Sequence, residues 1–158
     1  MNDIASGATL ADTERIVAAL VERSRAAQRR FEHAGQATLD TAAEAAAWAI
    51  MEPQCNRLLA ERAVSDTGLG NADDKFRKNY RKTLGLLRDL HGVATTGVIA
   101  RDEANGIVEI ARAVGVVVAI TPSTNPAATP ANKIINALKC GNAVIVAPSP
   151  KGYRRARC

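Results

Sequence analysis

The sequence predicts an α/β fold in which N-terminal helices precede a β-hairpin and the first βαβ unit of a larger sheet. Three observations support this prediction. Apolar residues recur every three or four positions through residues 1–92, as they do along amphipathic helices. An Asn-Gly pair separates two short segments of alternating polarity near residue 105. Finally, two wholly apolar segments, residues 114–120 and 143–147, flank a helical pattern, which is typical of buried parallel strands.

The N-terminal helices begin and end at recognisable residues. The first helix is expected to stop at Gly35, and Thr41 with Glu44 has the spacing of a capping box that opens a second helix. Pro53 either kinks that helix or begins a new one. After a stop signal at residues 66–70, Asp73 is the expected N-cap of a further helix.

The second half of the chain changes to strands. Residues 98–101 and 107–112 are expected to pair as an antiparallel hairpin around Asn105-Gly106. In the βαβ unit, Thr129 is the expected N-cap of a helix with Pro130 at its first position, and Gly141 ends that helix. Right-handed crossover connectivity makes the two apolar strands parallel, with the helix on one face. We therefore divide the chain into a helical region (1–92), a region with the hairpin and the βαβ unit (93–152) and an atypical tail (153–158).

Composition and charge exclude several classes of protein. Hydrophobic residues form 47% of the 158, which indicates a packed core, and aromatic residues form only 3%, so that core must be aliphatic. The net charge of +5 comes largely from residues 75–88 and the C-terminal tail, and a solvated basic surface is the favoured interpretation. No aromatic residues alternate with these bases as in single-strand binders, so we expect no nucleic-acid partner.

The chain also lacks the signals of membrane, secreted and metal-binding proteins. No apolar run approaches the roughly 20 residues that cross a bilayer, and the N-terminus has acids where a signal peptide has bases. Cys55, Cys140 and Cys158 are odd in number and far apart, which argues against disulfides and zinc. His33 and His91 have no other ligand at suitable spacing. We expect a cytoplasmic protein with reduced thiols, no membrane partner and no metal site.

The segment between the two apolar strands carries the polar groups of interest. It reads Thr121-Pro122-Ser123-Thr124-Asn125-Pro126, and it follows the carboxyl end of a buried strand, where ligands bind in open α/β sheets. From geometry alone, a ligand-binding loop and an ordinary βα turn both remain open. The segment is not a glycine-rich phosphate loop, since neither GxGxxG nor a Walker A sequence occurs. Cys140 lies at a helix C-terminus, where the dipole disfavours a thiolate, so we assign it a packing role.

These residues resemble one known family. VGVVVAITPSTNPAATPANKIINALKCGNAVIVAPSPKG, residues 114–152, resembles the CoA-acylating branch of the aldehyde dehydrogenases, and so do DTGLGN and DK in residues 66–75. Within that branch, the wording APSPKG, with Ser149 where many relatives have His, resembles acylating sulfoacetaldehyde dehydrogenases. The resemblance covers nearly all of the chain up to Gly152 and implies an aldehyde dehydrogenase cofactor domain of Rossmann-like architecture.

The resemblance also implies a reaction and a set of site residues. In this family a cysteine thiolate attacks a small aldehyde, hydride passes to NAD or NADP, and the thioester is transferred to coenzyme A. Asn125 is our candidate donor to the aldehyde oxyanion because its amide can donate, although gap-free counting from Pro122 places Thr124 at the family's Asn position. The residues expected to border the cofactor are Ile120, Thr121, Pro122, Ser123, Thr124, Ser149 and Pro150.

The C-terminal residues depart from the family pattern. From Tyr153 onward the sequence resembles translation in a shifted reading frame, so we expect an incomplete gene or a frameshift. On this hypothesis the catalytic domain and its nucleophilic Cys are absent, the chain alone is inactive, and the parent enzyme is a homo-oligomer. Two other hypotheses were weighed: a helical interaction or regulatory domain, and a basic nucleic-acid binder using residues 75–88.

Overall fold

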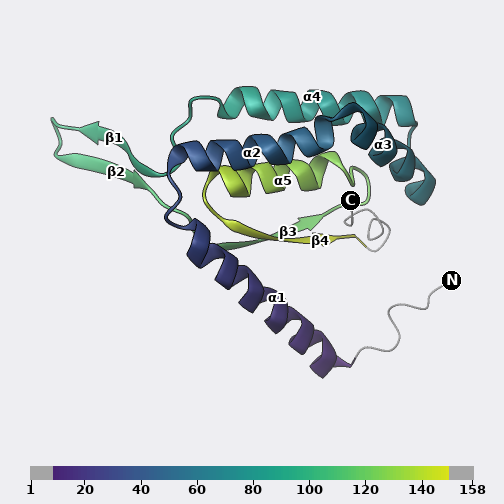
Figure 1. Ribbon diagram of the computed structural model, residues 1–158, viewed down its shortest axis with the longest axis horizontal. Coiled ribbons are helices and arrows are strands. Elements are labelled where there is room, and N and C mark those ends of the chain that lie inside the picture. Colours follow the sequence, from purple (N-terminus) through teal and green to yellow (C-terminus); the bar gives the residue numbers. More distant parts are fainter. Residues whose placement is uncertain (1–8, 150–158) are drawn as a thin grey trace.

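The computed structural model describes residues 9–149, which form a mixed α/β structure (Figure 1). Four helices come first, then a hairpin, and then a strand, a helix and a strand. The elements are α1 (Leu10–Phe31), α2 (Gln36–Met51), α3 (Pro53–Thr67), α4 (Ala72–Leu90), β1 (Gly97–Asp102), β2 (Ile107–Ala111), β3 (Val116–Thr121), α5 (Ala128–Lys139) and β4 (Ala143–Pro148). The predicted fold class and order of elements are confirmed.

The two C-terminal strands form the predicted parallel pair. Val116 lies opposite Ala143 at one end of the pair, and Thr121 lies opposite Pro148 at the other. Helix α5 connects them and lies with α2 on one side of this sheet, and α1 crosses on the other side (Figure 1). Gly141 has a φ of +70° just after α5, a backbone conformation that glycine adopts without strain.

The hairpin forms a separate antiparallel sheet that extends away from the rest of the molecule (Figure 1). Gly97 pairs with Ala111 and Asp102 with Ile107, and a bulge interrupts the register near Val98. Gly106 has a φ of +66°, but the connection spans residues 103–106 and Asn105 has no positive φ, so the hairpin is confirmed without the primed turn that Asn-Gly favours. No helix of the described residues packs against this hairpin.

The core joins the N-terminal helices to the βαβ unit. Ala43 and Ala47 of α2 and Ile135 of α5 are almost completely buried, and Leu86, Leu87 and Leu90 of α4 pack around them. Small alanine side chains let α2 approach α5 closely, and Ile135 fills the space between the helices. The position of α5, and hence of the loop that precedes it, therefore depends on α2 and α4.

Three expected helix starts were wrong. Helix α2 begins at Gln36, so Thr41 lies inside it and donates its hydroxyl proton to the Ala37 carbonyl at 2.9 Å. Gly35 is the N-cap of α2, since α1 already ends at Phe31. Helix α2 continues through Thr41 and Glu44, the residues that resemble a capping box, because its alanine-rich face packs against neighbouring helices.

The starts of α4 and α5 also differ from the prediction. The N-cap of α4 is Asn71, whose side-chain oxygen accepts a hydrogen bond from the amide of Asp74 at 2.8 Å, so Asp73 lies within the first turn. The N-cap of α5 is Ala127 rather than Thr129, and it gives no side-chain cap. Pro53 begins a new helix, α3, as one of the two stated alternatives predicted.

The two faces of the apolar strand β3 are unequally covered among the described residues, as expected for a parallel sheet of only two strands. Ala119 and Thr121 are buried beneath α5, but the alternate residues Val118 and Ile120 are 59% and 75% exposed. Successive side chains of a strand point to opposite faces. One face of this sheet is thus only partly covered by residues 9–149.

Candidate functional site

The candidate site lies at the edge of the parallel sheet where both strands end. Because Thr121 lies opposite Pro148, the loop after β3 and the residues after β4 meet at the same edge. Residues 122–127 connect β3 to α5, and Ser149 follows β4 directly. Pro150, which we also expected to border the cofactor, lies outside the described residues.

Asn125 is fixed through its backbone and has an available side chain. Its carbonyl oxygen accepts a hydrogen bond from the amide of Thr129 at 3.2 Å, which anchors the loop to the first turn of α5. Its side chain is half-buried and has no hydrogen-bond partner among residues 9–149. An amide in this position is able to donate a hydrogen bond to an oxyanion at the sheet edge.

The other predicted residues of this loop do not all face the same way. Ser123 is half-buried, whereas Pro122 and Thr124 are exposed. Ile120 points to the open face of the sheet and Thr121 to the α5 face, because they are neighbours on one strand. The loop residues therefore lie together at this edge, whereas the side chains of Ile120 and Thr121 lie on opposite faces of the sheet.

Ser149 presents an unusual polar atom beside this loop. Its hydroxyl oxygen is buried and has no hydrogen-bond partner within the part of the chain that the structure describes. Buried hydroxyls normally have a partner, so this group is suited to a ligand or a further part of the protein at this edge.

An apolar hollow of about 420 Å³ lies next to the two loops. Residues of α2, α3, α5 and β4 line it, and it reaches Pro126 after Asn125 and Pro148 before Ser149. Cys55 also lines this hollow. No local sequence pattern predicts this hollow, because its walls come from segments that are far apart along the chain.

Neither of the two described cysteines forms a disulfide, and they differ in their distance from the loop. Cys140 is the C-cap of α5, so the whole 12-residue helix, about 18 Å long at 1.5 Å per residue, separates it from the candidate site. Cys55 is exposed near the N-terminus of α3. Cys158 lies outside the described residues. Among residues 9–149, no group of three or more His, Cys, Asp or Glu is arranged to hold a metal ion, and no helix is long and apolar enough to cross a membrane.

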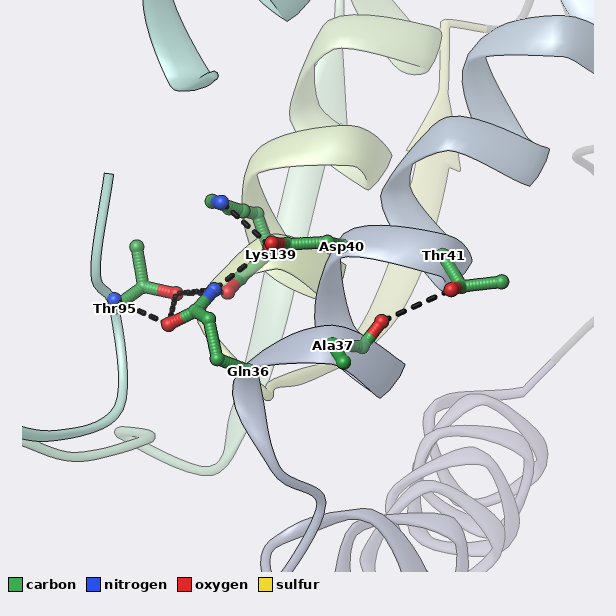
Figure 2. Close-up of polar contacts among 6 residues, drawn as sticks. All are labelled: Gln36, Ala37, Asp40, Thr41, Thr95 and Lys139. Carbon is green, nitrogen blue, oxygen red and sulfur yellow. Dashed lines mark hydrogen bonds and ion pairs between the residues drawn. The ribbon is translucent and has the colours of Figure 1, made fainter. Parts of the chain in front are cut away.

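A polar network holds the opposite end of α5 (Figure 2). The Lys139 ammonium, only 4% exposed, lies 2.5 Å from Oδ1 of Asp40, and Gln36 donates to the same oxygen at 2.7 Å. The hydrogen bond from Lys139, which has the larger effect, and the one from Gln36 both lower the pKa of Asp40 below its usual 3.8. Thr95 donates its amide proton to Gln36 at 2.7 Å and its hydroxyl proton to the Lys139 carbonyl. The network thus ties α2, α5 and the connection to the hairpin together.

A second polar contact attaches α1 to the start of β4. The side chain of Gln28 is buried; its Nε2 donates to the Gly141 carbonyl at 2.9 Å, and its Oε1 accepts from the Ala143 amide at 2.5 Å. Asn142 accepts from the Gly115 amide at 2.9 Å. The side chains of Gln28 and Asn142 thus provide hydrogen-bond partners for backbone groups near the starts of β3 and β4.

Known proteins match this chain over nearly its whole length. The sequence model of the Aldehyde dehydrogenase family matches residues 4–155. The chain belongs to this family. It is 79% identical over 136 residues to the acylating sulfoacetaldehyde dehydrogenase of Cupriavidus necator, covering 86% of this chain and 28% of that protein. It is 40% identical over 134 residues to the acylating sulfoacetaldehyde dehydrogenase of Bilophila wadsworthia, covering 85% and 29%.

Solved structures support the same branch. An acetylating aldehyde dehydrogenase of Geobacillus thermoglucosidasius has a TM-score of 0.82 and 38% identity, covering 87% of this chain and 30% of that one. A propionaldehyde dehydrogenase of Rhodopseudomonas palustris with bound propionyl-CoA has a TM-score of 0.71 and 25% identity, covering 85% and 29%. The chain spans under a third of these relatives and corresponds to the N-terminal part of an acylating aldehyde dehydrogenase. The interaction-domain and nucleic-acid alternatives are not favoured.

Proposed function

We propose that this chain contributes the cofactor edge and the oxyanion donor of an enzyme that oxidises a small aldehyde to its acyl-CoA. The balanced reaction is aldehyde plus NAD(P)⁺ plus CoA giving acyl-CoA, NAD(P)H and a proton. The family match and the acylating relatives support the reaction class. The nucleophilic cysteine belongs to the remaining part of the longer enzyme, and the 158-residue chain alone is expected to be inactive.

Asn125 carries the chemical part of the proposal. The hydrogen bond from the Thr129 amide to its carbonyl fixes the backbone, while its side-chain amide has no hydrogen-bond partner among residues 9–149 at the carboxyl edge of β3. We assign this amide to the aldehyde oxygen, where negative charge develops when the carbonyl carbon is attacked. A preorganised donor stabilises such charge at no cost of reorganisation, which is worth about 10²–10³ in kcat.

The cofactor would lie across the same edge. The residues proposed to border it are Ile120 and Thr121 at the end of β3, Pro122, Ser123 and Thr124 on the loop that follows, and Ser149 and Pro150 after β4. The unpartnered Ser149 hydroxyl is consistent with this role. NAD(P)⁺, when bound, supplies the hydride acceptor, and these residues orient it and exclude water. NAD and NADP both remain within the proposal.

Sulfoacetaldehyde is the proposed substrate. The support is the 79% identity to the acylating sulfoacetaldehyde dehydrogenase of Cupriavidus necator, which exceeds the 45% over 95 residues to the acetaldehyde dehydrogenase (acetylating) EutE of Salmonella typhimurium and the 31% to the succinate-semialdehyde dehydrogenase (acetylating) of Clostridium kluyveri. We further propose a cytoplasmic enzyme, because neither described cysteine is in a disulfide, as is usual in a reducing compartment.

The parent enzyme is proposed to be a homo-oligomer that pairs through the β1–β2 hairpin. A two-stranded hairpin is marginally stable in water by itself, and both of its edges are open to further strands. Its side chains add exposed apolar surface, namely Val98, Ile99, Ile107, Val108 and Ile110.

A chimera tests the proposed reaction. Residues 9–149 replace the matching segment of the Cupriavidus necator relative, and sulfoacetaldehyde, acetaldehyde and succinate semialdehyde are compared with NAD⁺ or NADP⁺, with and without CoA. We expect reduced cofactor and acyl-CoA to form together, fastest with sulfoacetaldehyde, and no turnover by the 158-residue chain alone. A folded chimera that turns over none of these aldehydes would overturn the proposal, and a preference for acetaldehyde would overturn its substrate part.

A further inference from the structure

Helices α2 and α5 pack through a smooth surface that fixes their axial positions weakly. Ala43 and Ala47 of α2 contribute only methyl groups to it, and Ile135 of α5 is the large side chain buried against them. Packed helices fix their mutual position by fitting ridges of side chains into grooves, and alanine gives shallow ridges. The apolar contact therefore sets the distance between the two helices more firmly than it sets the position of α5 along its own axis.

The polar network at the C-terminal end of α5 supplies this axial constraint (Figure 2). It consists of Gln36, Asp40, Thr95 and Lys139 and is called the Lys139 network below. The Lys139 ammonium lies 2.5 Å from Oδ1 of Asp40, although the Lys139 side chain is only 4% exposed. Gln36 donates to the same carboxylate at 2.7 Å and accepts from the Thr95 amide at 2.7 Å. Because hydrogen bonds are short and directional, this end of α5 cannot slide along α2 while they persist.

The N-terminal end of α5 has weaker anchors and carries the candidate site. Its N-cap, Ala127, makes no side-chain cap hydrogen bond, and Pro130 has no amide proton to donate. A hydrogen bond from the Thr129 amide to the Asn125 carbonyl ties this end to the loop. Asn125 therefore follows any axial movement of α5, since a regular helix of 12 residues carries a shift at its C-terminus to its N-terminus.

A buried ion pair adds less stability than its short distance suggests. Removing one partner leaves an unpaired buried charge and destabilises the fold, but replacing both partners by apolar residues of similar volume is often neutral, because the cost of desolvation offsets the attraction. Lys139 bears the larger part of this cost, since the Asp40 side chain is 37% exposed. The pair is thus better explained by the position that it defines than by the free energy that it adds.

We propose that Asp40 and Lys139 are positioning residues, which fix α5 along its axis and thereby hold the Asn125 amide at the aldehyde oxygen. Thr95 contributes through its hydroxyl, which donates to the Lys139 carbonyl at the end of α5. The inference rests on the proposed function, because it acts through Asn125. A displacement of about 1 Å at a reacting group lowers a rate by about 10²-fold, so an axial shift of α5 is large enough to affect kcat.

A double apolar substitution separates positioning from stability. D40L/K139M removes both charges and keeps similar side-chain volumes, so we expect the 158-residue chain to unfold in urea no more readily than before. The axial position of α5 is read from nuclear Overhauser effects (NOEs) between the methyl groups of Ile135 and those of Ala43 and Ala47. We expect these NOEs to weaken or to move to other alanines of α2, because the network no longer fixes α5.

The same substitution in the chimera with the Cupriavidus necator relative tests the effect on the reaction. We expect kcat to fall at least about tenfold and the KM for CoA to change less than about twofold, because Asn125 acts in the transition state. T95V, which removes the hydroxyl bonded to the Lys139 carbonyl, should also lower kcat, and T95S, which keeps that hydroxyl, should not. The matched control R57M/D73L removes an ion pair of 2.7 Å between α3 and α4 and should change neither the NOEs nor kcat.

Three outcomes would overturn the proposal. Unchanged NOEs in a stable D40L/K139M chain would show that packing alone fixes α5. Unchanged kcat in the double variant of an active chimera would show that the axial position of α5 does not control the site. A double variant that unfolds much more readily than the original chain would show that the pair serves stability. Failure of the proposed function is a different result, an unsubstituted chimera without turnover, and the NOEs then still decide whether the Lys139 network fixes α5.

Discussion

Replacing Gln28 by alanine should open the start of β4. The Gln28 side chain accepts from the Ala143 amide at 2.5 Å and donates to the Gly141 carbonyl at 2.9 Å, and it is only 7% exposed. Alanine leaves both backbone groups without their partner in a buried place. An orphaned buried group costs about 1–3 kcal/mol, so opening at Ala143 becomes easier by that amount. This corresponds to amide hydrogen exchange at Ala143 that is roughly 5- to 150-fold faster.

Exchange measured by NMR resolves this amide from its neighbours. The Gly115 amide, which is bonded to Asn142, serves as the internal control and should change far less. Q28E adds a pH test, because its carboxylate still accepts from Ala143 but repels the Gly141 carbonyl. Burial and this carbonyl raise the folded pKa of the new group, so protection is regained as the pH falls through that value. Equal acceleration at Ala143 and Gly115 in Q28A would refute the assigned contact.

Four further substitutions test the packing, the polar network and the N-cap of α4. Ile135→Ala should lower the free energy of unfolding by about 3 kcal/mol in urea titrations, because the side chain is completely buried between α2 and α4; a loss under about 1 kcal/mol would contradict this. Asp40→Asn should make stability less sensitive to acid: the lowered pKa of Asp40 means that its pairing with Lys139 stabilises the fold above pH 3.8 and is lost as the pH falls through the folded value, so identical acid profiles would contradict the pairing. Asn71→Ala should cost about 1 kcal/mol and Asp73→Ala less, and the reverse order would contradict the N-cap assignment.

Elements specified by nearby residues were predictable from the sequence. The hairpin around Asn105-Gly106 was predictable, because Gly106 takes a positive φ near the end of the four-residue connection 103–106, although this connection is not the two-residue primed turn that Asn-Gly favours. The parallel pair of β3 and β4 follows from two continuous apolar segments joined by a helix of ordinary length. The position of Asn125 at the strand end follows from the same connectivity.

Features that depend on distant partners were not predictable. Gln28 bonds to residues 113 and 115 positions away, and Gln36 bonds to Thr95, which is 59 positions away. Amide side chains on a helix resemble ordinary surface residues until the fold brings a strand start beside them. The apolar hollow near Cys55 was missed for the same reason, since its walls share no local pattern.

The predicted starts of the helices were wrong for a local reason. Several residues near each start are able to cap, and sequence spacing does not choose among them. Asn71 and Asp73 both suit an N-cap, and the structure uses Asn71, with Asp73 in the first turn paired to Arg57 at 2.7 Å. Similarly, Thr129 has the chemistry of a cap but lies one residue inside α5, where its amide bonds to the Asn125 carbonyl.

The most direct test of the account compares Asn125→Ala with Thr124→Ala in the chimera with the Cupriavidus necator relative. The measurement is kcat for CoA-dependent aldehyde oxidation at saturating substrate. If the Asn125 amide stabilises the oxyanion, its removal lowers kcat about 10²- to 10³-fold, whereas removal of the exposed Thr124 hydroxyl changes kcat little. The opposite order, with Thr124→Ala the severe variant, would contradict the assignment of this site.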